Sequence, residues 1–122
     1  MVDRAVARCV ELGLVDDAAY AEMRVTSLRR RGRSSRKIRA TLSAKGVEAS
    51  VLDAAMQKDD GSDLAAAIIH ARRRRIGPWR TKPADENTRS REIASICRAG
   101  FSYGIARRVV EANSPEDLAS AD

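Results

Sequence analysis

The chain has 122 residues, of which 43% are hydrophobic, which is enough for one small domain or a few small repeats. Only 3% are aromatic, so a core must be built from small aliphatic residues, which suit close helix packing better than a large ligand cavity. The formal net charge is +6, and 19 of the 23 basic residues are arginine. This bias indicates either bidentate contacts with phosphates or carboxylates, or a GC-rich coding sequence.

The cysteines and the apolar runs indicate the compartment. Cys9 and Cys97 are far apart and neither lies in a CxxC pair, so reduced thiols in or near the core are expected. Arg4 and Arg8 interrupt any signal peptide, and the longest apolar run, Leu64 to Ile69, is far too short to span a bilayer. The sequence therefore predicts a cytoplasmic protein with no membrane association.

Apolar residues recur at helical spacing along the whole chain, and no segment alternates as a strand does. We expect Asp16 or Asp17, Ser34 or Ser35, and Ser102 to cap helices. Residues 77–88 are predicted to form a loop. The predicted helices cover about residues 2–12, 17–31, 35–45, 51–56, 62–76, 88–99 and 103–110.

Two segments of the chain resemble each other. Residues 40–56 align with residues 94–110 at an offset of 54, which pairs Gly46 with Gly100 and Val47 with Phe101. Internal similarity of this size predicts stacked helical modules that share a core. The fold class expected is therefore all-α.

The strongest local feature is a basic segment. Residues 24–45 contain nine arginines and lysines and no acidic residue, and like charges without a counter-ion repel one another. An anionic partner is therefore expected. In a second run, residues 72–75, consecutive helical positions point in different directions, so only one or two can face a partner. The candidate partner-binding residues are Arg24, Arg29, Arg30, Arg31, Arg33, Arg36, Lys37, Arg39, Arg72 and Arg75.

Motifs for catalysis or cofactor binding do not occur in the sequence. His70 is the only histidine and lies among apolar residues of a predicted helix, which favours a core or half-buried position. Helix capping explains the acidic pair Asp16 and Asp17. We find no glycine-rich phosphate loop, HExxH or GxSxG motif. We therefore expect no enzymatic activity, no catalytic residue, no cofactor and no metal.

Several short motifs follow one another in a specific order. Gly13 to Asp17 read G-L-V-D-D, residues 29–32 are arginine-rich and end in glycine, residues 36–42 read R-K-I-R-A-T-L, and residues 45–47 read K-G-V. With these motifs, residues 12–56 resemble the middle repeat of the RecX family. The segment RAGFSYGIARRVV, residues 98–110, is similar to the last repeat of that family.

The resemblance implies tandem three-helix repeats with the first repeat mostly missing, as in an N-terminally short or truncated member. It divides the chain into the last helix of an incomplete first repeat (1–15), a second three-helix repeat (16–60), a third (61–113) and an acidic flexible tail (114–122). Full-length members are expected to be monomers.

The same resemblance implies binding to filaments of the RecA recombinase, largely in the filament groove. Binding would restrain the ATPase, co-protease and strand-exchange activities of RecA, within DNA repair, recombination and the SOS response. Single- or double-stranded DNA is a further candidate partner. The basic segment by itself leaves one alternative open, a stand-alone basic helical DNA-binding protein.

Overall fold

The computed structural model describes residues 16–119, and every regular element in that range is a helix. The predicted all-α class is confirmed. The predicted helix over residues 2–12 and the incomplete first repeat lie outside the described residues. The elements are α2 (Asp17–Arg30), α3 (Ser35–Ala44), α4 (Ala49–Gln57), α5 (Asp63–Arg74), the 3-10 helix η1 (Gly77–Trp79), α6 (Glu86–Arg98), α7 (Tyr103–Glu111) and α8 (Pro115–Ala119).

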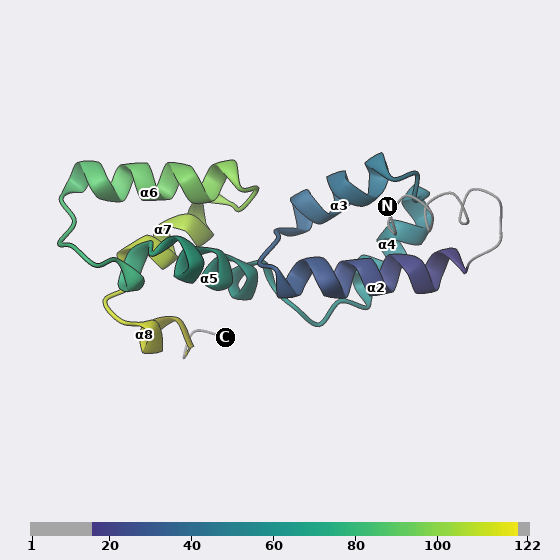
Figure 1. The fold of residues 1–122 in the computed structure, drawn as a ribbon, viewed down its shortest axis with the longest axis horizontal. Coiled ribbons are helices and arrows are strands. Elements are labelled where there is room, and N and C mark those ends of the chain that lie inside the picture. Colours follow the sequence, from purple (N-terminus) through teal and green to yellow (C-terminus); the bar gives the residue numbers. More distant parts are fainter. Residues whose placement is uncertain (1–15, 120–122) are drawn as a thin grey trace.

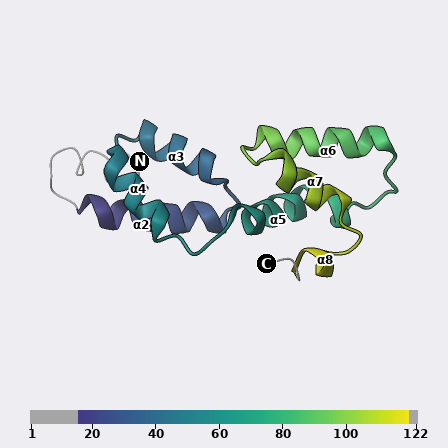
Figure 2. The same cartoon turned by 180° about the vertical axis from the view of Figure 1, so that it is seen from behind.

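The helices form two bundles that lie side by side along the long axis of an extended molecule (Figure 1). One consists of α2, α3 and α4, and the other of α5, α6 and α7 with α8 beside them. Figure 2 shows the same division from behind, with α4 packed on α2 and α7 packed on α5.

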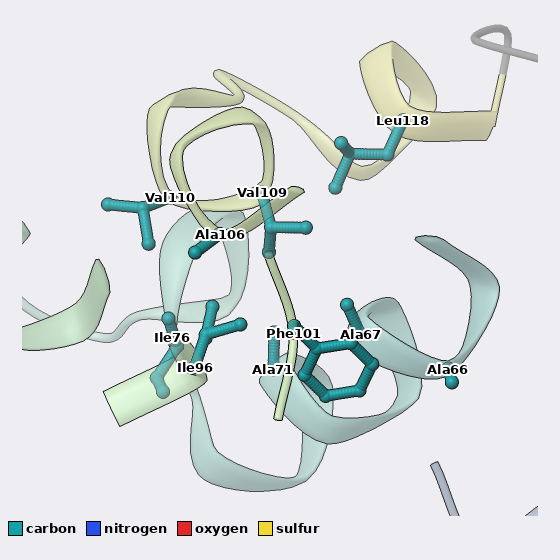
Figure 3. Packing of buried hydrophobic residues seen from close by; sticks show 10 residues of the cluster. All are labelled: Ala66, Ala67, Ala71, Ile76, Ile96, Phe101, Ala106, Val109, Val110 and Leu118. Carbon is teal, nitrogen blue, oxygen red and sulfur yellow. The ribbon is translucent and has the colours of Figure 1, made fainter. Parts of the chain in front are cut away.

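Each bundle has its own hydrophobic core. The core of the α2–α4 bundle is centred on Val25, Ile38 and Leu42, while that of the α5–α7 bundle contains Ile96 and Val109 (Figure 3). The two clusters of buried residues are separate. The prediction of a core shared between the modules was therefore wrong: each set of three helices buries its own apolar faces, and polar groups and small residues join the bundles.

The predicted internal similarity appears as two matching corners. Gly46 lies between α3 and α4 with φ +89°, and Gly100 lies between α6 and α7 with φ +99°, a left-handed conformation that favours glycine. In each corner the residue after the glycine forms a backbone hydrogen bond with the preceding helix. Val47 N–H donates to the Leu42 carbonyl, and Phe101 N–H donates to the Ile96 carbonyl. The glycines thus turn the chain so that the following apolar side chain enters the core.

Side-chain caps fix where the helices begin. Asp16 caps α2, Ser34 caps α3 and Ser102 caps α7, as the sequence predicts. Helix α6 begins at Glu86, earlier than predicted, because the carboxylate of Asp85 accepts hydrogen bonds from the Thr88 amide at 2.7 Å and the Thr88 hydroxyl at 2.9 Å.

The predicted flexible tail is wrong for residues 115–119. These residues form α8, and the side chain of Leu118 is 3% exposed and belongs to the core of the α5–α7 bundle (Figure 3). Proline is favoured in the first turn of a helix, where its missing N–H is not needed. Leu118 is the one residue of α8 that is buried against the bundle. None of the helices described is long and apolar enough to cross a membrane.

Candidate anion-binding surface

The two bundles meet where the turn between α2 and α3 touches the corner between α6 and α7. Ser34 is fully buried there, and its hydroxyl donates a hydrogen bond to the Ala99 carbonyl at 3.2 Å. The same oxygen accepts from the Lys37 amide at 3.1 Å, so it also caps α3. A Cβ on Gly100 would lie 2.4 Å from this oxygen. Ser34 therefore caps α3 and also packs against Gly100, where any larger residue would collide with its hydroxyl.

Arg29 forms a second connection, and it differs from its prediction as a partner-binding residue. Its Nε lies 2.7 Å from Asp59, one terminal nitrogen lies 2.7 Å from Asp63, and the other donates to the Ser35 hydroxyl at 2.6 Å. The side chain is only 10% exposed. Arg29 is therefore neutralised inside the molecule. The acids that neutralise it lie outside the basic segment 24–45: Asp59 is in the linker after α4, and Asp63 is the first residue of α5.

The pKa values of this cluster show that the ion pairs outweigh the cost of burial. Burial alone would raise the pKa of Asp63, but hydrogen bonds from Arg29 and from the amide and hydroxyl of Ser35 hold it below its ordinary value. Burial alone would likewise lower the pKa of Arg29, but hydrogen bonds and charge attraction from Asp63 and Asp59 raise it above its ordinary value. Asp63 and Arg29 are thus both charged at neutral pH, and Asp63 keeps its charge to a lower pH than an ordinary aspartate does.

The structure places the other predicted residues of the basic segment at several positions on the α2–α4 bundle. Arg24 is half-buried on α2. Arg30 and Arg31 are exposed and border a groove along α2 beside Met23. Arg39 is exposed and forms an ion pair with Asp53 of α4 at 2.6 Å. Arg36 is exposed on α3.

Arg33 and Lys37 instead face the other bundle. Together with Arg74 of α5, Arg98 of α6 and His70 of α5, they line a cavity of about 270 Å³ between the bundles. Gly32, Ser95 and Ala99 complete its lining. We call this cavity the junction pocket. Because the lining side chains belong to both bundles, the pocket exists only while the bundles stay in contact.

Two cations of the junction pocket, Arg74 and Arg98, escaped the sequence prediction. From the run 72–75 the sequence favours Arg72 and Arg75, but the structure places Arg74 in the pocket and both of those residues outside its lining. A signal was present, because Arg74 follows His70 by four positions and shares its helix face. No such signal exists for Arg98, which the fold brings to this place from a distant helix.

Cys97 is a half-buried free thiol, as predicted; Cys9 lies outside the described residues. Within residues 16–119, no group of three His, Cys, Asp or Glu side chains is arranged to hold a metal ion. The most distinctive chemistry of this part of the chain is cationic. Fold and site together define a protein of tandem three-helix bundles that presents arginine and lysine side chains at and around the contact between bundles.

Comparison with known proteins identifies the family. Residues 16–56, which contain α2 and α3 and nearly all of α4, match the family model for the second three-helix domain of RecX. The chain is 45% identical over 115 residues to the regulatory protein RecX of Myxococcus xanthus (strain DK1622), an alignment that covers 92% of the chain and 62% of that relative. The chain therefore belongs to the RecX family.

Two further relatives carry the same name. The regulatory protein RecX of Agrobacterium fabrum is 39% identical over 84% of the chain and 54% of its own length, and that of Thermobifida fusca is 32% identical over 90% and 60%. The chain thus spans between about half and two thirds of the length of these relatives. No solved structure matches it.

Proposed function

We propose that this protein binds filaments of the RecA recombinase and restrains their ATPase, co-protease and strand-exchange activities. Such a regulator would act in DNA repair, recombination and the SOS response, in the cytoplasm. The observation that carries the proposal is the similarity to regulatory proteins named RecX, which extends over 92% of the chain in one case. The proposal assigns no catalytic role to any residue of the chain.

The shape of the molecule supports this role. Two bundles in a row give an extended body (Figure 1), and an extended body contacts more subunits of a repeating filament than a compact one of equal size does. The exposed cations Arg30, Arg31 and Arg36 project from the α2–α4 bundle. They suit acidic side chains of RecA or phosphates of the enclosed DNA, since arginine binds both types of oxyanion with paired hydrogen bonds.

Binding is tested by co-sedimentation with RecA filaments assembled on single-stranded DNA with a slowly hydrolysed nucleotide. We expect the protein to sediment with the filaments and to stay in solution with the same DNA coated by an unrelated single-strand-binding protein. Sedimentation with both, or with neither, would contradict specific recognition of RecA.

The alternative function is stand-alone DNA binding, which the net charge of +6 favours. It is distinguished by salt dependence in the absence of RecA. A protein that neutralises Z phosphates of duplex DNA loses affinity with a log–log slope of roughly −0.9Z. Tight duplex binding with a steep slope and no response to RecA would support this alternative over regulation.

A further inference from the structure

The junction pocket concentrates positive charge without compensation. Arg33 reaches it from the turn before α3, and Lys37, Arg74 and Arg98 reach it from α3, α5 and α6. None of the four forms an ion pair with a carboxylate of residues 16–119. Five other cations of the described chain have an acidic partner, namely Arg29, Arg39, Lys58, Arg80 and Arg107, whereas exposed arginines such as Arg30 and Arg36 pair with no carboxylate of residues 16–119. Four unneutralised cations around one cavity repel each other, and an anion between them would remove that repulsion.

The pocket is also built rather than incidental. Ser34 and Ala99 are hydrogen-bonded across the contact of the two bundles, next to Arg33 on one side and Arg98 on the other. The backbone positions from which these two side chains project are therefore fixed relative to each other. A site fixed in advance loses less entropy on binding than one that must first be ordered.

His70 provides independent support for a ligand at this pocket. Its ring packs at an angle on Phe101, with centroids 6.0 Å apart, so the core of the α5–α7 bundle holds it in place. Its Nε2 atom is buried and has no hydrogen-bond partner among the described residues. Buried polar atoms are nearly always paired, and His70 lines the junction pocket, so this nitrogen is a candidate hydrogen-bonding group for a ligand there.

We propose that the junction pocket is a binding site for a phosphate group, held between the two bundles. Three arginines offer planar forks of N–H donors that match phosphate oxygens, and four cations exceed what a single carboxylate would neutralise. The phosphate is either free, as in inorganic phosphate or pyrophosphate, or part of a nucleic-acid backbone. This inference goes beyond the regulatory role, because phosphate binding here requires no RecA.

His70 makes occupation of the site dependent on pH. Burial lowers the pKa of His70, and the charges of Arg74 and Arg33 lower it further, so the ring is mostly neutral at pH 7. The groups that face it are Arg33 and Lys37 from the α2–α4 bundle, Arg74 from its own helix and Arg98 from α6. A bound phosphate offsets their charges and raises the pKa of His70, so binding takes up a proton in mild acid and tightens as the pH falls.

The test uses the fact that the chain contains one histidine. In the full chain, free of affinity-tag histidines, the His70 ring resonances are followed by NMR during titration with inorganic phosphate, with pyrophosphate and with a short oligothymidylate. A poly-glutamate peptide at matched ionic strength is the fourth ligand. We expect a saturable shift with at least one phosphate ligand. A response to inorganic phosphate or pyrophosphate indicates a free phosphate as the ligand, and a response to the oligothymidylate alone indicates a backbone phosphate.

Matched arginine variants locate the binding. Arg98→Gln should weaken phosphate binding by about tenfold or more, because it removes a charge-assisted hydrogen bond. Arg72→Gln, which removes an exposed arginine outside the pocket, should leave it nearly unchanged. The pH dependence is followed through backbone amide resonances, because His70→Gln removes the ring signal, and it is measured with the oligothymidylate, whose phosphodiesters do not titrate near neutrality. It should disappear in His70→Gln.

The proposal is overturned if no phosphate ligand gives a saturable shift, if Arg98→Gln and Arg72→Gln weaken binding equally, or if poly-glutamate binds more tightly than every phosphate ligand. The last result would assign the pocket to an acidic protein segment. Loss of fold in a variant would show in its amide spectrum, and Arg74→Gln then replaces Arg98→Gln. A failed RecA assay leaves these outcomes unaffected, so the two proposals fail separately.

Discussion

Arg29 and Asp63 lie 34 positions apart in the sequence, yet their side chains meet at 2.7 Å and join the end of α2 to the start of α5. Asp63 also accepts hydrogen bonds from the amide and the hydroxyl of Ser35, at 2.9 and 2.8 Å. One carboxylate thus holds the last turn of α2, the first residue of α3 and the first residue of α5 together. Because the two hydrophobic cores are separate, we expect this polar contact to be a main determinant of the orientation of one bundle relative to the other.

The first prediction concerns the stability provided by Arg29. Arg29→Ala leaves Asp59 and Asp63 without their cation and should lower the free energy of unfolding by about 2–3 kcal/mol, less than for a fully buried pair. Arg30→Ala, the exposed neighbour on the same helix, should change it by no more than about 0.5 kcal/mol. Urea unfolding followed by circular dichroism compares the two, and equal effects would show that Arg29 is an ordinary surface residue.

The second prediction concerns acid stability. The pKa of Asp63 is lowered in the folded protein, so the stability it contributes is complete above its ordinary value of 3.8 and is lost as the pH falls through the folded value. The difference in unfolding free energy between the native chain and Asp63→Asn should therefore be largest near neutral pH and shrink below pH 3.8. A difference that stays constant from pH 6 to pH 3 would refute the assigned ion pair.

Two glycines near the last corner should respond in opposite directions. Gly100→Ala combines a φ of +99° with a contact of 2.4 Å to the Ser34 hydroxyl, and should destabilise the protein by about 1–3 kcal/mol. Gly104→Ala, in α7, meets no atom within 4 Å and should stabilise it by up to about 0.5–1 kcal/mol through helix propensity. Thermal unfolding measures both, and a loss of stability in Gly104→Ala would mean that α7 packs differently.

The fourth prediction concerns partner binding by α3. Replacing both Arg36 and Arg39 by alanine should weaken inhibition of RecA by about 1–3 kcal/mol, the range for charge-assisted hydrogen bonds. Folding should hardly change, because the ion pair of Arg39 with Asp53 is exposed and such pairs contribute little. Replacing both Arg107 and Arg108 of α7 by alanine is the control, since it removes the same number of charges from the other bundle, where Arg107 pairs with Glu111 within its own helix. If the control variant loses as much inhibition as the Arg36 and Arg39 variant, the loss comes from the lower net charge and not from contacts of α3.

Local features of the fold were predictable from the sequence. Ile38 and Leu42 lie four apart and are fully buried, and Gly46 and Gly100 form the corners that the internal alignment pairs. These features depend on spacing and on the conformational freedom of single residues. The helix at 115–119 was missed because Leu118 is its one buried residue and its partners lie in other helices.

The candidate site was predictable only in part, because its geometry depends on contacts distant in sequence. Charge counting along residues 24–45 treats every cation alike, but the fold neutralises Arg29 with acids from the next segment and places Arg33 in the same cavity as Arg98. Nothing in the spacing of residues 29, 59 and 63 distinguishes Arg29 from Arg30. Which cations are available to a partner is therefore decided by the packing of one bundle against the other.

The regulatory role is tested most directly by the steady-state, DNA-dependent ATPase activity of preformed RecA filaments as this protein is added. Regulation of a filament predicts that the ATPase rate falls at protein concentrations well below that of RecA, because one molecule affects several subunits. An ATPase rate that is unchanged even with the protein in excess over RecA would contradict the proposed function.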